Sequence, residues 1–205
     1  MQFSDAVALV ADRGRFMQEA VPAGEGAMAA ILGLDDAKVI EICAQAAEGE
    51  VVSAVNFNSP GQVVVAGAAA AVDRAIELAK AAGAKRALKL SVSAPSHCAL
   101  MKPAAERLAE RLQGIEISAP AIPVMNNADV ASPEGSDAIR DALVRQLYSP
   151  VRWVETIQKM SADGVDALVE CGPGKVLVGL NKRIVKEMNA VAVFDSATLD
   201  AALAG

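Results

Sequence analysis

Four strand-like and two helical segments alternate in a fixed order between residues 26 and 91, and this order constrains the fold more than any other feature. The strand-like segments are Gly26–Leu32, Val51–Phe57, Gln62–Gly67 and Arg86–Ser91. A helical pattern over residues 36–48 follows the first strand, and another over residues 69–82 follows the third. The turn-forming residues Asn58-Ser59-Pro60-Gly61 separate the second and third strands, which predicts a hairpin. The resulting order, β-α-β-β-α-β, is the ferredoxin-like arrangement, and we expect a small subdomain at residues 21–92.

The chain on either side of this unit follows a different rhythm. An amphipathic helix is predicted over residues 4–20, where Pro22 and Gly24 end it. After residue 92, strands and helices alternate as in a parallel sheet with crossover helices. The predicted helices cover residues 103–113, 137–147, 151–162 and 175–188, and the predicted strands are Ile122–Asn126, Val165–Cys171 and Ala190–Phe194. We expect the second of these strands to be buried on both faces. Three strands are few for an independent sheet of this kind, so we expect its first strands to be missing.

The composition excludes several classes of function. The net charge of −6 and the single Trp and single Tyr argue against nucleic-acid binding. The chain has no apolar run long enough to cross a membrane and begins with no signal-peptide pattern, so we expect no membrane association. The three cysteines, Cys43, Cys98 and Cys171, are far apart, and one histidine cannot complete an ordinary zinc site. We therefore expect no metal site, and mostly buried, reduced thiols in a cytoplasmic protein.

Two side chains are candidates for chemistry. His97 is the only histidine and follows a strand-like run and Pro95, a position from which a side chain can point into a cleft. Imidazole is the group best suited to proton transfer near neutral pH. Arg13 lies in the predicted first helix beside Gly14, and its planar guanidinium matches a carboxylate in two-point geometry. The alternatives are a turn histidine that only bonds nearby backbone and a solvated arginine.

Other motifs point to structural roles. The turn Gly172-Pro173-Gly174-Lys175 has Val169 and Val176 where a phosphate-binding loop needs a glycine and a Ser or Thr. We expect a structural turn there, although the helix amides behind it could face an anion. Cys98 and Cys171 are possible nucleophiles by position, but each is more simply a core residue. The chain contains no Gly-x-Ser-x-Gly nucleophile elbow.

Six segments together resemble the malonyl-coenzyme A:acyl carrier protein transacylase family of bacterial fatty-acid synthesis. These segments match the family in order and spacing across nearly the whole chain and are Arg13–Gln18, Gly26–Ala30, Asn56–Val64, Pro95–His97, Gln146–Val151 and Glu170–Gly174. The resemblance implies an α/β fold, namely a partial α/β-hydrolase-like parallel-sheet core with an inserted ferredoxin-like subdomain. Residues 1–20 would then be a helix of the large acyltransferase domain, and residues 93–205 its remainder.

The resemblance also implies a reaction and its site. A serine would take malonyl from coenzyme A and pass it to the phosphopantetheine thiol of acyl carrier protein, with no cofactor. His97 would be the catalytic base and acid, and Arg13 would pair with the malonyl carboxylate. Met17 and Ser96 would help shape the acyl pocket, and the backbone of Gln146 would hold the histidine ring.

The chain departs from the family in one respect. The family's nucleophilic serine lies in a Gly-His-Ser-x-Gly elbow upstream of the arginine helix, and this chain contains neither that elbow nor the earlier glutamine-containing loop. We therefore expect a fragment, the C-terminal two thirds of such an enzyme, that is inactive alone. Two alternatives remain: a non-catalytic module that binds acyl carrier protein or acyl-coenzyme A through basic residues such as Lys85 and Lys182, or a structural half that pairs with another polypeptide.

Overall fold

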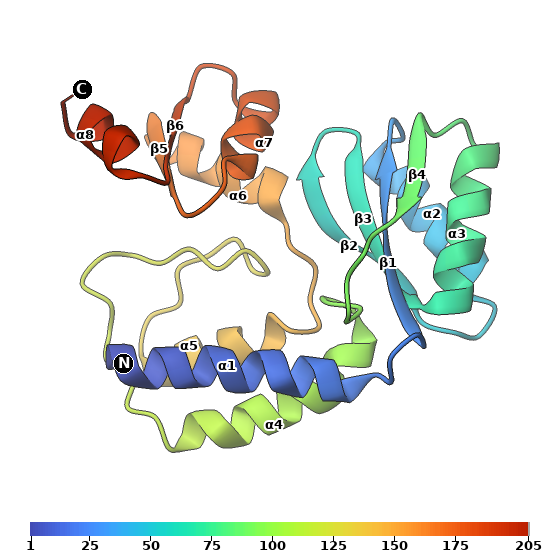
Figure 1. Ribbon diagram of the computed structural model, residues 1–205, viewed down its shortest axis with the longest axis horizontal. Coiled ribbons are helices and arrows are strands. Elements are labelled where there is room, and N and C mark those ends of the chain that lie inside the picture. The colour runs from blue at the N-terminus through green and yellow to red at the C-terminus, as the bar shows by residue number, and fades with distance from the viewer. Residues whose placement is uncertain (205) are drawn as a thin grey trace.

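A four-stranded antiparallel sheet forms one part of the molecule. The computed structural model describes residues 1–204 (Figure 1). The elements of this part are β1 (Gly26–Leu32), α2 (Asp36–Ala47), β2 (Val52–Ser59), β3 (Gln62–Ala68), α3 (Ala69–Ala81) and β4 (Arg86–Lys89). The strands lie in the order β2-β3-β1-β4, and each neighbouring pair is antiparallel. The predicted β-α-β-β-α-β order is therefore confirmed.

Local chemistry explains where these elements begin and turn. The carboxylate of Asp35 accepts the Lys38 main-chain N–H at 2.7 Å and caps the start of α2. The hairpin between β2 and β3 is tighter than predicted, because β2 continues to Ser59 and only Pro60 and Gly61 form the turn. Gly61 has a φ of 71°, a left-handed conformation that glycine adopts without steric cost.

Both faces of this sheet are covered. The two helices pack on one face (Figure 1), where the largest fully buried side chains are those of Ile31, Val39, Val63, Val65 and Val72. Side chains of the other face, among them Met28, Val55 and Val64, form a cluster with Cys98. Because Cys98 directly follows His97, this face of the sheet supports the segment that carries the histidine.

A group of helices forms the second part. These elements are α1 (Phe3–Ala20), the short 3₁₀ helix η1 (Ala99–Met101), α4 (Lys102–Gln113) and α5 (Ser136–Arg145). Helices α1 and α4 run side by side (Figure 1), and they share a core of Leu9, Phe16, Leu108, Leu112 and Leu147. Helix α1 buries only part of its surface in this core, and Val7 and Val10 remain exposed.

A small parallel sheet forms the third part. Its elements are α6 (Trp153–Ala162), β5 (Ala167–Cys171), α7 (Val176–Ile184), β6 (Asn189–Val193) and α8 (Ser196–Ala204). Strands β5 and β6 pair in parallel, which confirms the expected crossover arrangement. Helix α7 ends at Ile184 rather than near residue 188, and α8 was not predicted.

Two sequence predictions about this region are wrong. The segment Ile122–Asn126 is not a strand: Pro120 and Pro123 interrupt it, Ile122 is 77% exposed, and Asn126 forms only an isolated bridge with Ala131. The parallel sheet within residues 1–204 therefore has two strands rather than three. Strand β5 is also not buried on both faces: Val169 is 54% exposed, and within residues 1–204 β6 is the only strand that pairs with β5.

The three cysteines differ in burial. Cys43 and Cys98 are buried, as expected, and burial raises the pKa of the Cys43 thiol to about 12. Cys171, at the end of β5, is exposed, so the expectation of a small core residue is wrong there. All three thiols are free.

A pair of main-chain hydrogen bonds joins the antiparallel sheet to the rest of the chain. The Val151 N–H donates to the Val55 carbonyl at 2.7 Å, and the Phe57 N–H donates to the Val151 carbonyl at 2.9 Å. The segment between α5 and α6 is thereby attached to β2, the outer strand of the sheet. The end of α5 consequently has a fixed position relative to the sheet.

A Gly67→Ala substitution tests the packing of β2 on β3. A Cβ atom at Gly67 would lie 2.0 Å from the Val51 carbonyl oxygen and 2.6 Å from the Val52 Cα, and backbone atoms cannot move aside cheaply. We expect the free energy of unfolding to fall by about 2–3 kcal/mol in urea denaturation. The matched control is Gly179→Ala in α7, where the space is open and the free energy should rise by about 0.5–1 kcal/mol. Equal effects of the two substitutions would contradict the register.

Candidate active site

The main chain beyond the end of α5 holds His97. Its backbone N–H donates to the Leu147 carbonyl at 3.0 Å, and its ring Nδ1 lies 2.9 Å from the Gln146 carbonyl oxygen. A carbonyl oxygen can only accept, so Nδ1 carries the proton and Nε2 keeps its lone pair. His97 has a φ of 66°, a conformation uncommon outside glycine that turns the ring toward these carbonyls. The ring is therefore arranged as a base at Nε2.

Arg13 and His97 line the same cavity, which has a volume of about 410 Å³. The remaining lining residues come from α1, α4, α5 and the loop before α5 and are Leu9, Val10, Leu108, Asn127, Leu143 and Gln146. Arg13 is half-buried, and no side chain or carbonyl within residues 1–204 pairs with its guanidinium. The cavity thus offers a cation without a counter-ion beside a base, a pairing suited to an anionic substrate.

Burial and charge set the protonation of both groups. Burial lowers the pKa of His97, the positive charge of Arg13 lowers it further, and hydrogen bonds to the main chain of Gln146 and Ser149 oppose this only in part. The imidazole is therefore neutral at pH 7. Burial also lowers the pKa of Arg13, but a guanidinium remains protonated at any physiological pH.

The structure brings three of the five candidate residues together. Arg13, His97 and Gln146 line the cavity, and the backbone of Gln146 contacts the ring. Met17 does not line it; its side chain is buried in the core between α1 and α4. Ser96 is half-buried and its N–H donates to the Ala94 carbonyl, away from the cavity lining.

Asn127 also lines the cavity, and sequence reasoning missed it. Its side-chain oxygen accepts a hydrogen bond from the Gln146 side-chain amide at 3.2 Å. The sequence predicts a strand over residues 122–126, and this prediction leaves no role for the Asn126-Asn127 pair. Two consecutive asparagines are typical of a turn, and that signal was available in the sequence.

At the expected structural turn between β5 and α7, a side chain of this chain already bonds a helix amide. The carboxylate of Glu170 accepts the Val178 main-chain N–H at 2.8 Å, so a residue of the chain itself uses an amide at the start of α7.

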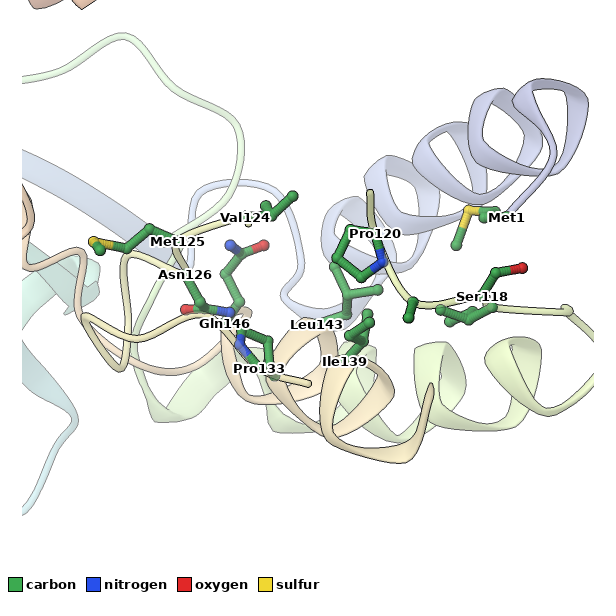
Figure 2. A pocket seen from close by; sticks show the side chains of 13 residues that line it. Met1, Ser118, Pro120, Val124, Met125, Asn126, Pro133, Ile139, Leu143 and Gln146 are labelled. Atoms are coloured by element: carbon green, nitrogen blue, oxygen red, sulfur yellow. The ribbon is translucent and has the colours of Figure 1, made fainter. Parts of the chain in front are cut away.

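A second cavity adjoins the first. It has a volume of about 370 Å³, and Leu143 and Gln146 line both. Figure 2 shows it running from Met1 and Ser118 at one end to Asn126 and Gln146 at the other. Its walls are mostly apolar, and none of the side chains that line it within residues 1–204 is charged, in contrast to the cavity of Arg13 and His97.

The structure is that of a mixed α/β protein in which a histidine and an arginine line one cavity. The chain belongs to the acyl transferase domain family, whose family model matches residues 1–200. None of the helices within residues 1–204 combines the length and apolar character needed to cross a membrane.

Curated relatives and solved structures agree with this assignment. The malonyl CoA-acyl carrier protein transacylase of Haemophilus influenzae is 63% identical over 201 residues, which cover 98% of this chain and 64% of the relative. An acyl carrier protein S-malonyltransferase from Vibrio cholerae superposes with a TM-score of 0.96 at 61% identity, covering 98% of this chain and 66% of that one. The chain therefore spans slightly less than two thirds of the length of these relatives.

A second solved structure includes a bound partner. A malonyl-transacylase in complex with its type II PKS acyl-carrier protein superposes with a TM-score of 0.98 at 57% identity. The match covers all of this chain and 66% of that one.

The single histidine allows a direct test of the proposed protonation. The His97 ring should give one set of imidazole NMR signals, with the proton on Nδ1 and a pKa below about 6.5. The free energy of unfolding should then decrease as pH falls below this value, because the unfolded chain binds the proton before the folded chain does. The urea-unfolded chain is the control and should titrate near its ordinary value. A folded-state pKa above that of the unfolded chain would contradict the burial of the ring.

Proposed function

We propose that this chain contributes to the transfer of malonyl from coenzyme A to the phosphopantetheine thiol of acyl carrier protein, a step of fatty-acid synthesis. The observation that carries the proposal is the cavity shared by His97 and Arg13. The names of the relatives, each a malonyl transacylase or malonyltransferase, support the same reaction. No cofactor is needed, since malonyl-coenzyme A is itself the substrate.

His97 acts in this proposal as base and then as acid. Its Nε2 takes the proton from a serine hydroxyl as the serine attacks the thioester carbonyl, and then gives that proton to the departing coenzyme A thiolate. The second half-reaction reverses these roles with the carrier thiol. The serine itself is not identified among residues 1–205, because none of them stands in a Gly-x-Ser-x-Gly elbow. We therefore expect these 205 residues alone to be inactive in transfer.

Arg13 binds the free carboxylate of malonyl. Its half-buried guanidinium has no partner within residues 1–204, so a carboxylate that enters the cavity gains a charge-assisted pair. An acetyl group has no carboxylate and leaves the cation unpaired, which makes the arginine a source of selectivity. Met17 and Ser96, which do not line the cavity, would shape the acyl site from behind.

The fold is assigned accordingly. We infer that residues 21–92 are a ferredoxin-like subdomain inserted in an α/β-hydrolase-like core to which residues 1–20 and 93–205 belong. The observed order β2-β3-β1-β4 and the parallel pair β5–β6 support this division. We propose a cytoplasmic location, where an exposed free thiol such as Cys171 stays reduced.

A binding role without catalysis is the second candidate. Several basic side chains on the surface have no ion-pair partner within residues 1–204, namely Lys85, Arg86, Lys182 and Lys186. Lys80 and Lys89, which belong to the same sequence clusters, are already paired with Glu77 and Asp73. The unpaired cations could meet an acidic carrier protein.

Charge reversal at named positions separates this candidate from nonspecific charge, and salt dependence tests whether the binding is electrostatic. We expect Lys182→Glu combined with Lys186→Glu to weaken binding of acyl carrier protein about 10-fold at low salt in calorimetry, and salt to weaken the unsubstituted complex. Reversal of the already paired Lys80 is the control and should change binding less. Equal binding by all three proteins would eliminate this surface.

Substitution of Arg13 tests the main proposal. We expect Arg13→Gln to weaken malonyl-coenzyme A binding about 10- to 100-fold in calorimetry, the loss expected for one charge-assisted pair, and to leave acetyl-coenzyme A binding nearly unchanged. The matched control is Arg15→Gln on the same helix, because Arg15 is exposed and pairs with Asp12. Unaltered preference for malonyl in Arg13→Gln would refute the proposal.

A further inference from the structure

We propose that the loop 126–131 is a positioning device for His97, acting through Asn127 and Asp129 on the two residues at the end of α5. Neither loop residue forms a hydrogen bond with the imidazole; Asn127 bonds the side chain of Gln146, whose carbonyl contacts the ring, and Asp129 pairs with Arg145, the residue before it. The importance of this device for acyl transfer rests on the proposed function, whereas the orientation of the ring can be measured without any substrate.

The loop is a closed turn of defined shape. The Asn126 N–H donates to the Ala131 carbonyl at 2.8 Å, and the Val130 N–H donates back to the Asn126 carbonyl at 2.9 Å. The buried Asn126 side chain accepts the Ala128 N–H at 2.7 Å, and Val130 has a φ of 57°. A β-branched residue adopts this left-handed conformation only where surrounding contacts enforce it. The turn therefore presents its side chains from a fixed frame.

Arg145 and Gln146, at the end of α5, both form hydrogen bonds to side chains of this turn. Arg145 forms a two-point ion pair with Asp129, in which Nη2 and Oδ2 are 2.9 Å apart and Nη1 contacts Oδ1. Gln146, the next residue, donates from its side-chain amide to Asn127 at 3.2 Å. A planar guanidinium bound at two points fixes direction as well as distance. Both the last residue of the helix and the residue after it are thus tied to the same loop.

The attachment of Arg145 and Gln146 to this loop matters because the Gln146 carbonyl lies beyond the last helical residue. Such carbonyls have no partner within the helix and are free to fray. Here the Gln146 carbonyl receives the ring proton of His97 and the next carbonyl, of Leu147, receives the His97 N–H. The loop is anchored in turn at the start of α6, where the Arg152 N–H donates to the Asn127 carbonyl at 2.8 Å.

A comparison within α5 isolates this role. Arg140 also pairs with an acidic residue, Asp137, but that carboxylate is fully exposed near the start of the helix and contacts neither the loop nor Gln146. Stabilisation of the helix by an ion pair is common to both sites. Of these two ion pairs, only Arg145–Asp129 joins the loop to the residue that directly precedes Gln146.

The test uses the imidazole signals of the full chain. In Asp129→Asn and in Asn127→Ala, we expect the fraction of the Nδ1–H tautomer to fall and the His97 pKa to shift by about 0.5 units or more, because the Gln146 carbonyl loses its fixed direction. Asp137→Asn is the matched control and should leave both values unchanged. Asp129→Glu, which keeps the charge, should restore most of the tautomer preference. Arg13 is the only other titratable side chain that lines this cavity in residues 1–204, and it is present in every variant.

The outcomes are distinct. Folded Asp129→Asn and Asn127→Ala proteins with unchanged tautomer and pKa would overturn the inference, as would an equal change in Asp137→Asn. If Asp129→Asn does not fold, Arg145→Lys keeps the charge but not the planar fork, and it should show the same loss. A result in which the ring orientation depends on the loop while Arg13→Gln leaves malonyl selectivity intact would reject the proposed function and leave the positioning role standing.

Discussion

The hydrogen bond from His97 Nδ1 to the Gln146 carbonyl is the interaction on which the site depends. It joins residues that are 49 positions apart, fixes the proton on one ring nitrogen, and leaves the other nitrogen as the base. A main-chain carbonyl carries no net charge, unlike the carboxylate that orients histidine in many hydrolases. Arg13 can therefore share the cavity without an internal counter-ion that would compete with a substrate carboxylate.

Much of the antiparallel sheet could be predicted from the sequence because local signals agreed there. The Asn58–Gly61 segment predicts the hairpin, and the apolar patterns of the strands and helices have the correct periods. The two candidate residues from the sequence, Arg13 and His97, also lie on one cavity, but nothing local in either segment required this. That juxtaposition followed from the resemblance to the family rather than from the pattern around each residue.

The errors come from features that depend on neighbours in space. An apolar run such as Ile122–Asn126 becomes a strand only when another strand pairs with it, and none does so within residues 1–204. The burial of β5 was inferred from composition, yet the exposed Val169 shows that composition does not determine what covers a face. Asn127 was missed for a related reason, since its role depends on the position of Gln146, 19 residues away.

The attachment of Val151 to β2 has a consequence for self-association. An outer strand with unpaired amides and carbonyls is a template on which another chain can polymerise. Here Val151 occupies part of that template on β2. The opposite outer strand, β4, is only four residues long and carries Arg86, an exposed arginine with no ion-pair partner within residues 1–204. Like charges on adjacent copies would repel at β4, so the antiparallel sheet resists edge-to-edge aggregation on both sides by different means.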